Sequence, residues 1–326
     1  MRSSSALFIG VDGGGTKTAA ALCNQDGEIL AQASGDSTNM QSRPWPAVEA
    51  TLHELTASLL AQAGARREQV AVILFGLAGA DRPQARTRIF ASFADWTKTK
   101  VLIDNDAVTA LYSGTWGEPG IVLIAGTGSI ASGVSRTGER FRVGGWGYLL
   151  GDEGSGFDLG RRGLTAVLRA YDGRDAPTAM TGLVLDAFGM ASPQELIHMV
   201  YNADNPRKEL AQASRLVLQA AEAGDETACR LVAEAVTELT QLAMVCMAKM
   251  QENVPVVLAG GLLSEDTPIR RGLEDQLAAE RVDAIIPPCP PVIGTLVMSL
   301  REAGIPVDER VKQNMMRSWT GDERRG

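Results

Sequence analysis

The chain has few of the residues on which several common chemistries depend. It contains two histidines, His53 and His198, and both stand in stretches with helical apolar spacing. Its four cysteines are isolated, with none of the short spacings of a metal or redox motif: Cys23, Cys229, Cys246 and Cys289. This composition favours neither a histidine-dependent hydrolase nor a zinc enzyme. We therefore expect any catalysis to depend on carboxylates, hydroxyls and glycine-rich backbone.

Positive charge and long apolar runs are also scarce. The chain has 31 Lys and Arg against 39 Asp and Glu, a net charge of -8, which leaves no basic excess for nucleic-acid phosphates. No apolar run reaches the length that a bilayer requires. The run at residues 6–9 is cut by Asp12 and lacks a cleavage pattern of small residues, so we expect it to open the first strand. These features predict a cytoplasmic protein without a membrane or nucleic-acid partner.

One arrangement of strands and glycine turns occurs twice. Residues 7–11 lead into a Gly-Gly-Gly-Thr loop at 13–16, here called the first glycine hairpin, and two more strands follow to residue 33. Residues 121–125 lead into Gly-Thr-Gly-Ser at 126–129, the second glycine hairpin, and two more strands again follow. Each half thus opens with a β-meander.

The rest of the chain alternates between helices and strands, with helices dominating residues 155–251. We predict an α/β protein with two halves. The first domain is expected at residues 1–117, the second at 118–305 with a helical insertion, and a charged tail without assigned function at 306–326.

Neither standard phosphate-binding motif fits the glycine hairpins. Thr16 stands where a Walker A loop requires lysine, and Thr18 stands where a dinucleotide fingerprint requires glycine. The second hairpin fits the looser G-x-G-x-x-A form, but a strand follows it instead of a helix. If the two halves face each other, the hairpins could hold a polyphosphate between them, although tight structural turns also favour glycine. Asp12 could hold Mg²⁺ through water or cap the turn.

Seven segments, the two glycine hairpins among them, form a series of motifs along the chain. In chain order they are Val11-Asp12-Gly13-Gly14-Gly15-Thr16-Lys17, Ser37-Thr38-Asn39, Asp104-Asn105-Asp106-Ala107, Ala125-Gly126-Thr127-Gly128-Ser129, Gly144-Gly145-Trp146-Gly147, Gly151-Asp152-Glu153-Gly154-Ser155 and Leu258-Ala259-Gly260-Gly261. Together they resemble the phosphate-1, phosphate-2 and adenosine motifs of the superfamily of actin, hexokinase and heat-shock chaperone ATPases. The chain is most similar to the N-acetylglucosamine kinase and glucosamine kinase branch of the BadF/BadG/BcrA/BcrD-type ATPases. The resemblance spans about residues 8 to 300 and implies duplicated ribonuclease H-like (actin-like ATPase) domains with a central cleft.

The resemblance also implies roles for particular residues. Asp106, after a short strand and before a helix, would be the catalytic base, whereas its position alone equally suits an N-cap. Asp12 would hold Mg²⁺, with Asp104 as a lesser candidate. ATP would be bound by Gly13, Gly14, Gly15, Thr16, Lys17, Thr127, Gly128, Ala211, Gly260, Gly261 and Ser264. The sugar would be bound by Asn39, Asp106, Ser129, Gly145, Trp146, Gly147 and Asp152. Two purely structural alternatives stay open: Asp152 and Ser155 could cap the following helix, and Trp146 could be a core residue.

The resemblance implies an ATP- and Mg²⁺-dependent kinase for the 6-hydroxyl of an amino sugar, and a homodimer. N-acetylglucosamine is the first candidate acceptor and glucosamine the second, with N-acetylmuramic acid and glucose as alternatives. Met40 stands where vertebrate-type enzymes have a histidine, so the acyl environment can differ. A redox-activating ATPase of the BcrA/BcrD type is the competing hypothesis. Such activators bind an iron–sulfur cluster through cysteines, and this chain has no cysteine pair in the region between its two halves. An actin-like scaffold is the third.

Overall fold

The computed structural model describes residues 6–40, 42–80 and 82–320. Internal contacts divide the chain into two units. The first comprises the described residues of Met1–Glu118 and Pro287–Gly326, and the second comprises Pro119–Ile286. The predicted boundary lies one residue away from the observed one, but residues 287–305 pack with the first unit instead of the second.

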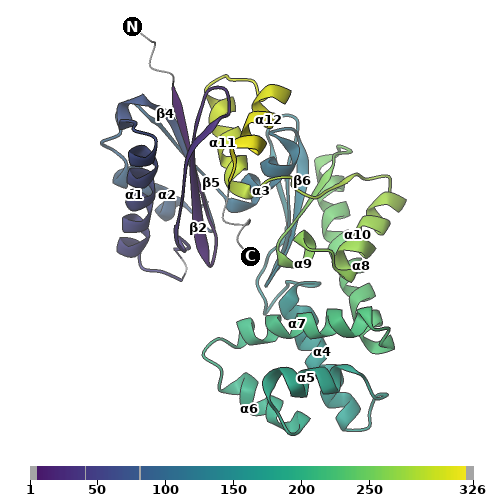
Figure 1. Cartoon of the computed structure of the whole chain (residues 1–326). Helices are drawn as coiled ribbons and strands as arrows, with labels where there is room; N and C mark the ends of the chain where they lie inside the picture. The colour runs from purple at the N-terminus through teal and green to yellow at the C-terminus, as the bar shows by residue number, and fades with distance from the viewer. Residues whose placement is uncertain (1–5, 41, 81, 321–326) are drawn as a thin grey trace. The chain divides into compact units, whose positions relative to one another are not determined.

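The first unit is built on a five-stranded sheet of order β3-β2-β1-β4-β5 (Figure 1). Its strands are β1 (Leu7–Gly13), β2 (Lys17–Asn24), β3 (Ile29–Asp36), β4 (Val70–Leu77) and β5 (Lys100–Asp104). The first three form the predicted antiparallel meander, while β4 and β5 continue it in parallel from β1. Two helices cover one face, α1 (Trp45–Gln62) and α2 (Pro83–Ser92). The other face carries α3 (Asp106–Thr115), α11 (Pro291–Glu302) and α12 (Glu309–Ser318).

Strand alternation along β1 explains how the two faces differ. Ile9 and Val11 point into the core under α1 and α2, whereas Phe8, Gly10 and Asp12 belong to the opposite face. A Cβ added at Gly10 would collide with Thr295, so α11 lies directly on the backbone of β1. This close packing explains why residues 287–305 belong to the first unit.

The charged tail is also part of the first unit. Its helix α12 begins at the N-cap Asp308 and buries Val311 and Met315. Both side chains pack beside Gly27, in the turn between β2 and β3. An amphipathic helix whose apolar residues are covered is a structural element of the unit.

The second unit repeats the first sheet. Its strand order is β10-β9-β6-β7-β8, and the meander β6-β7-β8 is again antiparallel, with β9 and β10 added in parallel. The strands are β6 (Gly120–Ala125), β7 (Ser129–Val134), β8 (Arg140–Gly144), β9 (Val256–Ala259) and β10 (Ala284–Ile285). The predicted α/β fold with a duplicated meander is confirmed.

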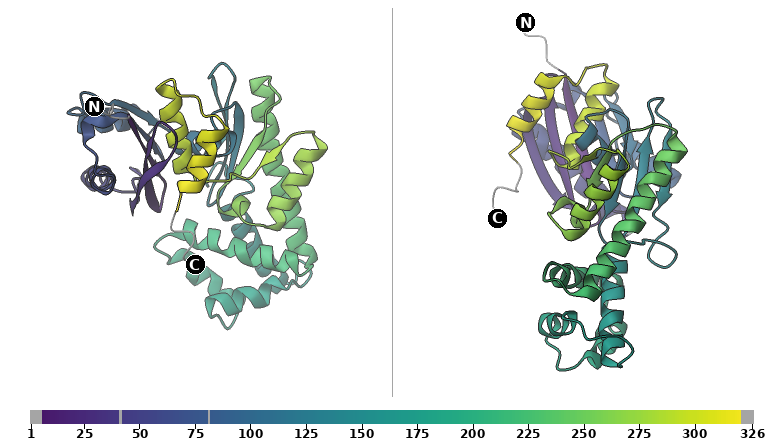
Figure 2. Two further views of the ribbon diagram at one scale, coloured as in Figure 1. Left: turned by 45° about the horizontal axis from the view of Figure 1, so that its top comes forward. Right: turned by 90° about the vertical axis from the view of Figure 1, so that its right-hand side faces the viewer.

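Helices make up the remainder of the second unit. They are α4 (Gly156–Tyr171), α5 (Met180–Phe188), α6 (Leu196–Tyr201), α7 (Pro206–Glu222), α8 (Glu226–Met250), α9 (Gly261–Ser264) and α10 (Pro268–Ala279). Figure 2 shows α4–α7 stacked beyond one end of the unit's sheet, while α8 packs along the sheet itself. The sequence prediction placed a helical insertion in this domain.

Helix α8 corrects one sequence prediction. Within the described residues it is long and apolar enough, by length and composition, to cross a membrane, although no such segment was expected. Its residues Leu231, Val236 and Leu239 lie in the core of the second unit. Core helices of globular domains pass the same test, and the burial of this face accounts for the composition.

Candidate functional site

The first glycine hairpin joins β1 to β2 and leaves its outer glycines in open space. A Cβ at Gly13 would collide with Thr38, so packing explains that glycine. A Cβ at Gly14 or Gly15 would meet nothing within 4 Å, and neither residue has a left-handed φ. Neither packing nor backbone conformation therefore requires glycine at these two positions. The Gly14 N–H donates to the Lys17 carbonyl within the turn, and the open space at both glycines leaves this stretch of backbone accessible to a ligand.

Asp12 is the second-last residue of β1, beside this hairpin, and lies close to helix α3. Thr109 Oγ1 is 2.7 Å from Asp12 Oδ1 and 2.8 Å from the Asp106 carbonyl oxygen, and its single proton is donated to one of them at a time. Burial raises the pKa of Asp12 to about 7; the Thr109 hydrogen bond opposes this shift, and the Asp106 carboxylate adds to it. A cation would stabilise these two neighbouring carboxylates in their charged form, so the residues fit the Mg²⁺ that the fold implies. Among the described residues, no group of three or more His, Cys, Asp or Glu could hold a metal.

Asp106 is the first residue of α3, and the residue before it caps the helix. The Asn105 side chain accepts the Ala107 N–H at 2.9 Å, which satisfies an N-terminal donor of α3. The N-cap alternative for Asp106 is therefore not what the structure shows. Asp104 is buried and its Oδ1 accepts the Asn105 N–H at 2.7 Å, so that carboxylate stabilises the turn.

Asn39 is held near the first hairpin by Ser37. Ser37 Oγ donates to the Gly14 carbonyl at 2.9 Å and accepts the Asn39 N–H at 3.2 Å. Arg43 Nη1 donates to the Ser37 carbonyl at 2.8 Å and further orders the segment. Asp12, Asp106, Asn39 and the first hairpin thus lie together in the first unit.

The second glycine hairpin joins β6 to β7 and is packed against the start of α4. The Gly126 carbonyl accepts the Gly156 N–H at 2.8 Å. A Cβ at Gly128 would lie 2.8 Å from Asp152 Oδ2 and 2.9 Å from Arg207 Nη2, so glycine is needed there for packing. The Thr127 side chain is exposed and available to a ligand.

The residues predicted to read the sugar surround this hairpin. Ser129 is buried; its hydroxyl donates to the Glu153 carbonyl at 2.8 Å and its carbonyl accepts the Gly145 N–H at 3.1 Å. Trp146 is 71% exposed, which excludes the core alternative, and the Arg142 guanidinium lies 5.2 Å from its ring centroid. Gly147 has a φ of 87° and open space where a side chain would be.

Asp152 and Ser155 have different roles in this loop. Ser155 caps α4 by accepting the Asp158 N–H at 3.2 Å, as the helix-capping alternative predicted. Asp152 is buried with a left-handed φ of 64°, and its carboxylate forms an ion pair with Arg207 at 3.0 Å. A buried aspartate in this strained conformation is typical of a functional position.

The predicted adenosine-binding residues also lie in the second unit. Gly260 has a φ of 88°, and a Cβ there would approach the Ala125 carbonyl oxygen to 2.5 Å. Gly261 follows directly, and its nitrogen would lie 3.9 Å from a Cβ at Gly126. The Ala211 carbonyl lies 3.6 Å from the Cβ position of Gly156, whereas Ser264 is exposed at the end of α9. The second hairpin, the Gly260 turn and Ala211 are therefore neighbours.

A cavity of about 430 Å³ opens beside Asp12 and Lys17 in the first unit. Its other walls are β3, the start of α11, and Trp319 and Thr320 after α12. Ser318, the last residue of α12, accepts the Ile29 N–H at 2.9 Å and so fixes the end of this helix to β3. The tail, which the sequence left without a function, thus forms one wall of the space next to the predicted metal-binding residue.

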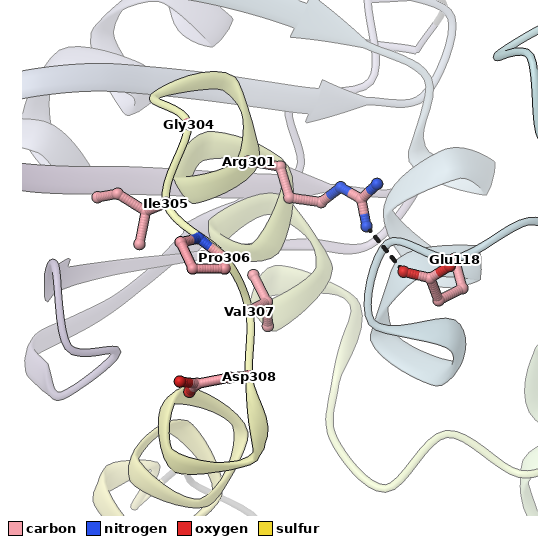
Figure 3. A pocket seen from close by; sticks show the side chains of 7 residues that line it. All are labelled: Glu118, Arg301, Gly304, Ile305, Pro306, Val307 and Asp308. Carbon is pink, nitrogen blue, oxygen red and sulfur yellow. Dashed lines mark hydrogen bonds and ion pairs between the residues drawn. The ribbon is translucent and has the colours of Figure 1, made fainter.

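A second cavity, of about 460 Å³, lies at the other end of α3 and α11 (Figure 3). Glu118 and Arg301 form an ion pair at 3.2 Å in its wall, and the turn at residues 304–308 completes it. Both helices start near Asp12 and run to this cavity, so about 15 Å of helix separates the two places. None of the predicted site residues lines this second cavity.

Two residues of the site were missed in the sequence. Thr109 follows Asp106 by three residues on a helix, a spacing that would have indicated contact with the first turn. Arg207 follows Asp152 by 55 positions on an amphipathic helix, where an arginine carries no signal of its own.

Comparison with known proteins gives consistent findings. The BadF/BadG/BcrA/BcrD ATPase family matches residues 9–299. An N-acetylmuramic acid/N-acetylglucosamine kinase of Clostridium acetobutylicum is 34% identical over 78% of this chain and 85% of its own. An N-acetyl-D-glucosamine kinase of Dictyostelium discoideum is 29% identical over 90% of this chain and 98% of its own. A solved Chromobacterium violaceum structure, provisionally assigned as an N-acetylglucosamine kinase, has a TM-score of 0.70 and 28% identity over 91% of this chain and all of its own.

Proposed function

The chain belongs to the BadF/BadG/BcrA/BcrD ATPase family, and we propose that it is an ATP-dependent kinase for the 6-hydroxyl of an amino sugar. The Clostridium and Dictyostelium relatives are both named as kinases of acetylated amino sugars, and they match most of the chain. N-acetylglucosamine is the first candidate acceptor and glucosamine the second. N-acetylmuramic acid and glucose are the alternatives, the former because the Clostridium relative's name includes it.

The placement of Asp106 is the observation that carries this proposal. Its carboxylate is not the cap of α3, it lies close enough to Asp12 to influence that residue's pKa, and Asp12 adjoins a glycine hairpin with two glycines that packing does not require. A base, a metal-binding carboxylate and a phosphate-binding loop are the parts that phosphoryl transfer needs.

In the proposed reaction Asp106 accepts the proton of the sugar 6-hydroxyl as its oxygen attacks the γ-phosphorus of ATP. The new O–P bond forms as the bond to the β–γ bridging oxygen breaks, and ADP leaves with that electron pair. When bound, Mg²⁺ would neutralise phosphate charge, and Asp12 would hold it through water. Thr16, Lys17 and Thr127 would contact the phosphates, which requires the two glycine hairpins to face one triphosphate.

The same proposal assigns the remaining residues. Asn39 and Asp152 would bind sugar hydroxyls, Trp146 would flank the ring, and Gly260, Gly261, Ser264 and Ala211 would bind adenosine. We further propose a cytoplasmic homodimer.

Measuring ADP release with a panel of hexoses and amino sugars tests this function. A kinase releases ADP only when an acceptor is present, and the sugar with the highest kcat/KM identifies the substrate. ADP release that is the same with and without every sugar would refute the kinase and favour the ATPase-activator alternative.

A further inference from the structure

Arg207 lies between two predicted ligand sites of the second unit. It is the second residue of α7, and Nη2 of its guanidinium reaches Asp152 Oδ2 at 3.0 Å. The same nitrogen would lie 2.9 Å from a Cβ at Gly128 of the second glycine hairpin. One side chain therefore contacts the carboxylate assigned to the sugar and borders the hairpin assigned to the phosphates.

The carboxylate of Asp152 needs this arginine. Its side chain is 4% exposed, and burying a charged carboxylate without a partner is costly. Among the described residues it accepts one other hydrogen bond, a long one from the Ser129 N–H at 3.4 Å. The ion pair with Arg207 is therefore the main interaction that orients this carboxylate.

The arginine itself keeps hydrogen-bonding capacity for a ligand. Its Nε is buried and has no hydrogen-bond partner among the described residues, an uncommon state for a buried donor. Its side chain is 39% exposed, and the guanidinium carbon lies 5.4 Å from the ring centroid of Tyr148. The exposed part of this side chain, not the buried Nε, is what an oxyanion would reach, and a planar guanidinium held over a ring and paired on one edge needs little reorganisation to bind one.

We infer that Arg207 is a positioning residue shared by the two substrates: it orients Asp152 for the sugar hydroxyls and donates to a nucleotide phosphate oxygen at the second glycine hairpin. This inference rests on the proposed kinase function. It assigns to one guanidinium a link between the sugar subsite and the phosphate subsite.

Steady-state kinetics with MgATP and the best acceptor of the sugar panel test the inference. The variants are Arg207→Met, Arg207→Lys and the matched control Arg215→Met. Arg215 is exposed on the same helix, eight residues further on. We expect Arg207→Met to raise KM for both the sugar and MgATP about ten-fold, with a smaller change in kcat. The sugar would meet an Asp152 carboxylate that has lost the partner orienting it, and the nucleotide would lose one charge-assisted hydrogen bond to a phosphate oxygen. Arg207→Lys should restore part of both KM values because it keeps the charge, and Arg215→Met should match the wild type.

Three outcomes would overturn the inference while leaving the kinase intact. In the first, Arg207→Met has the same two KM values as Arg215→Met. In the second, Arg207→Met raises the KM of only one substrate. In the third, it lowers kcat and leaves both KM values unchanged. A wild-type protein without sugar-dependent turnover would instead refute the proposed function on which the inference rests. Thermal unfolding of each variant identifies a loss of activity that follows from loss of folding.

Discussion

The two glycine hairpins occupy equivalent places in the two units but use glycine for different physical reasons. In the first, Gly14 and Gly15 have free space where a Cβ would be and have no left-handed φ. In the second, Gly128 is crowded by Asp152 and Arg207. The first hairpin thus keeps its backbone accessible, while the second accommodates a buried ion pair. A repeated sequence pattern therefore does not imply a repeated structural reason, and substitutions at the two hairpins should have separable effects.

The largest expected effect concerns Asp106, beside the first hairpin. Replacing Asp106 by Asn keeps the shape of the side chain but removes the base, so kcat should fall by about 10³-fold. ATP affinity should change little because the hairpins are intact. A coupled assay of ADP release with a nucleotide-binding titration measures both, and retained turnover would exclude Asp106 as the base.

The second effect is a stability change at Asp12. The pKa of Asp12 is about 7 in the folded state and 3.8 in its ordinary state. Between pH 3.8 and pH 7 the folded protein therefore keeps a proton on Asp12 that the unfolded chain has lost. Stability therefore falls as pH rises from about 4 to 7, and the charged form then costs up to about 4 kcal/mol. Asp12→Asn lacks this penalty and should be more stable than the wild type, by more at pH 8 than at pH 5. Urea unfolding at both pH values measures the difference; a constant difference would contradict the burial of this charge.

Crowding at the second hairpin predicts a third, mixed effect. Gly128→Ala places a methyl group against Asp152 and Arg207, so we expect the free energy of unfolding to fall by about 1–3 kcal/mol and the sugar KM to rise. Thermal unfolding and kinetics of the same preparation report the two changes. An unchanged melting temperature would mean that the ion pair moves aside freely.

The smallest expected effect is at Ser37, which ties Asn39 to the first hairpin. Ser37→Ala removes the hydrogen bond to the Gly14 carbonyl and should cost about 1 kcal/mol of stability. Its KM for the sugar should rise slightly because Asn39 loses a support. A sugar KM equal to that of the wild type would show that the other contacts of the segment order Asn39 without Ser37.

Local pattern predicted much of this architecture. Strand alternation and glycine turns are encoded within about ten residues, so both meanders and both hairpins could be found in the sequence. Asp12 and Asp106 were candidates because they stand at strand ends, whereas Asn39 and the catalytic role of Asp106 followed from the family resemblance; the structure brings the three together in the first unit. The parts that could not be predicted depend on contacts between distant segments. Helix α11 belongs to the first unit because it packs on Gly10, far away in sequence. The partner of Asp152 likewise comes from helix α7, 55 residues further along the chain.

Nucleotide affinity of the first-hairpin variants Gly14→Ala and Gly15→Ala tests the central claim most directly. Because an added Cβ meets nothing within 4 Å at either position, the fold should accept the methyl group and the melting temperature should stay at the wild-type value. If these glycines admit the phosphates of ATP, the methyl group lies in their path and the Kd for MgATP should rise about ten-fold. A Kd equal to that of the wild type would contradict phosphate binding at this hairpin, and with it the kinase mechanism.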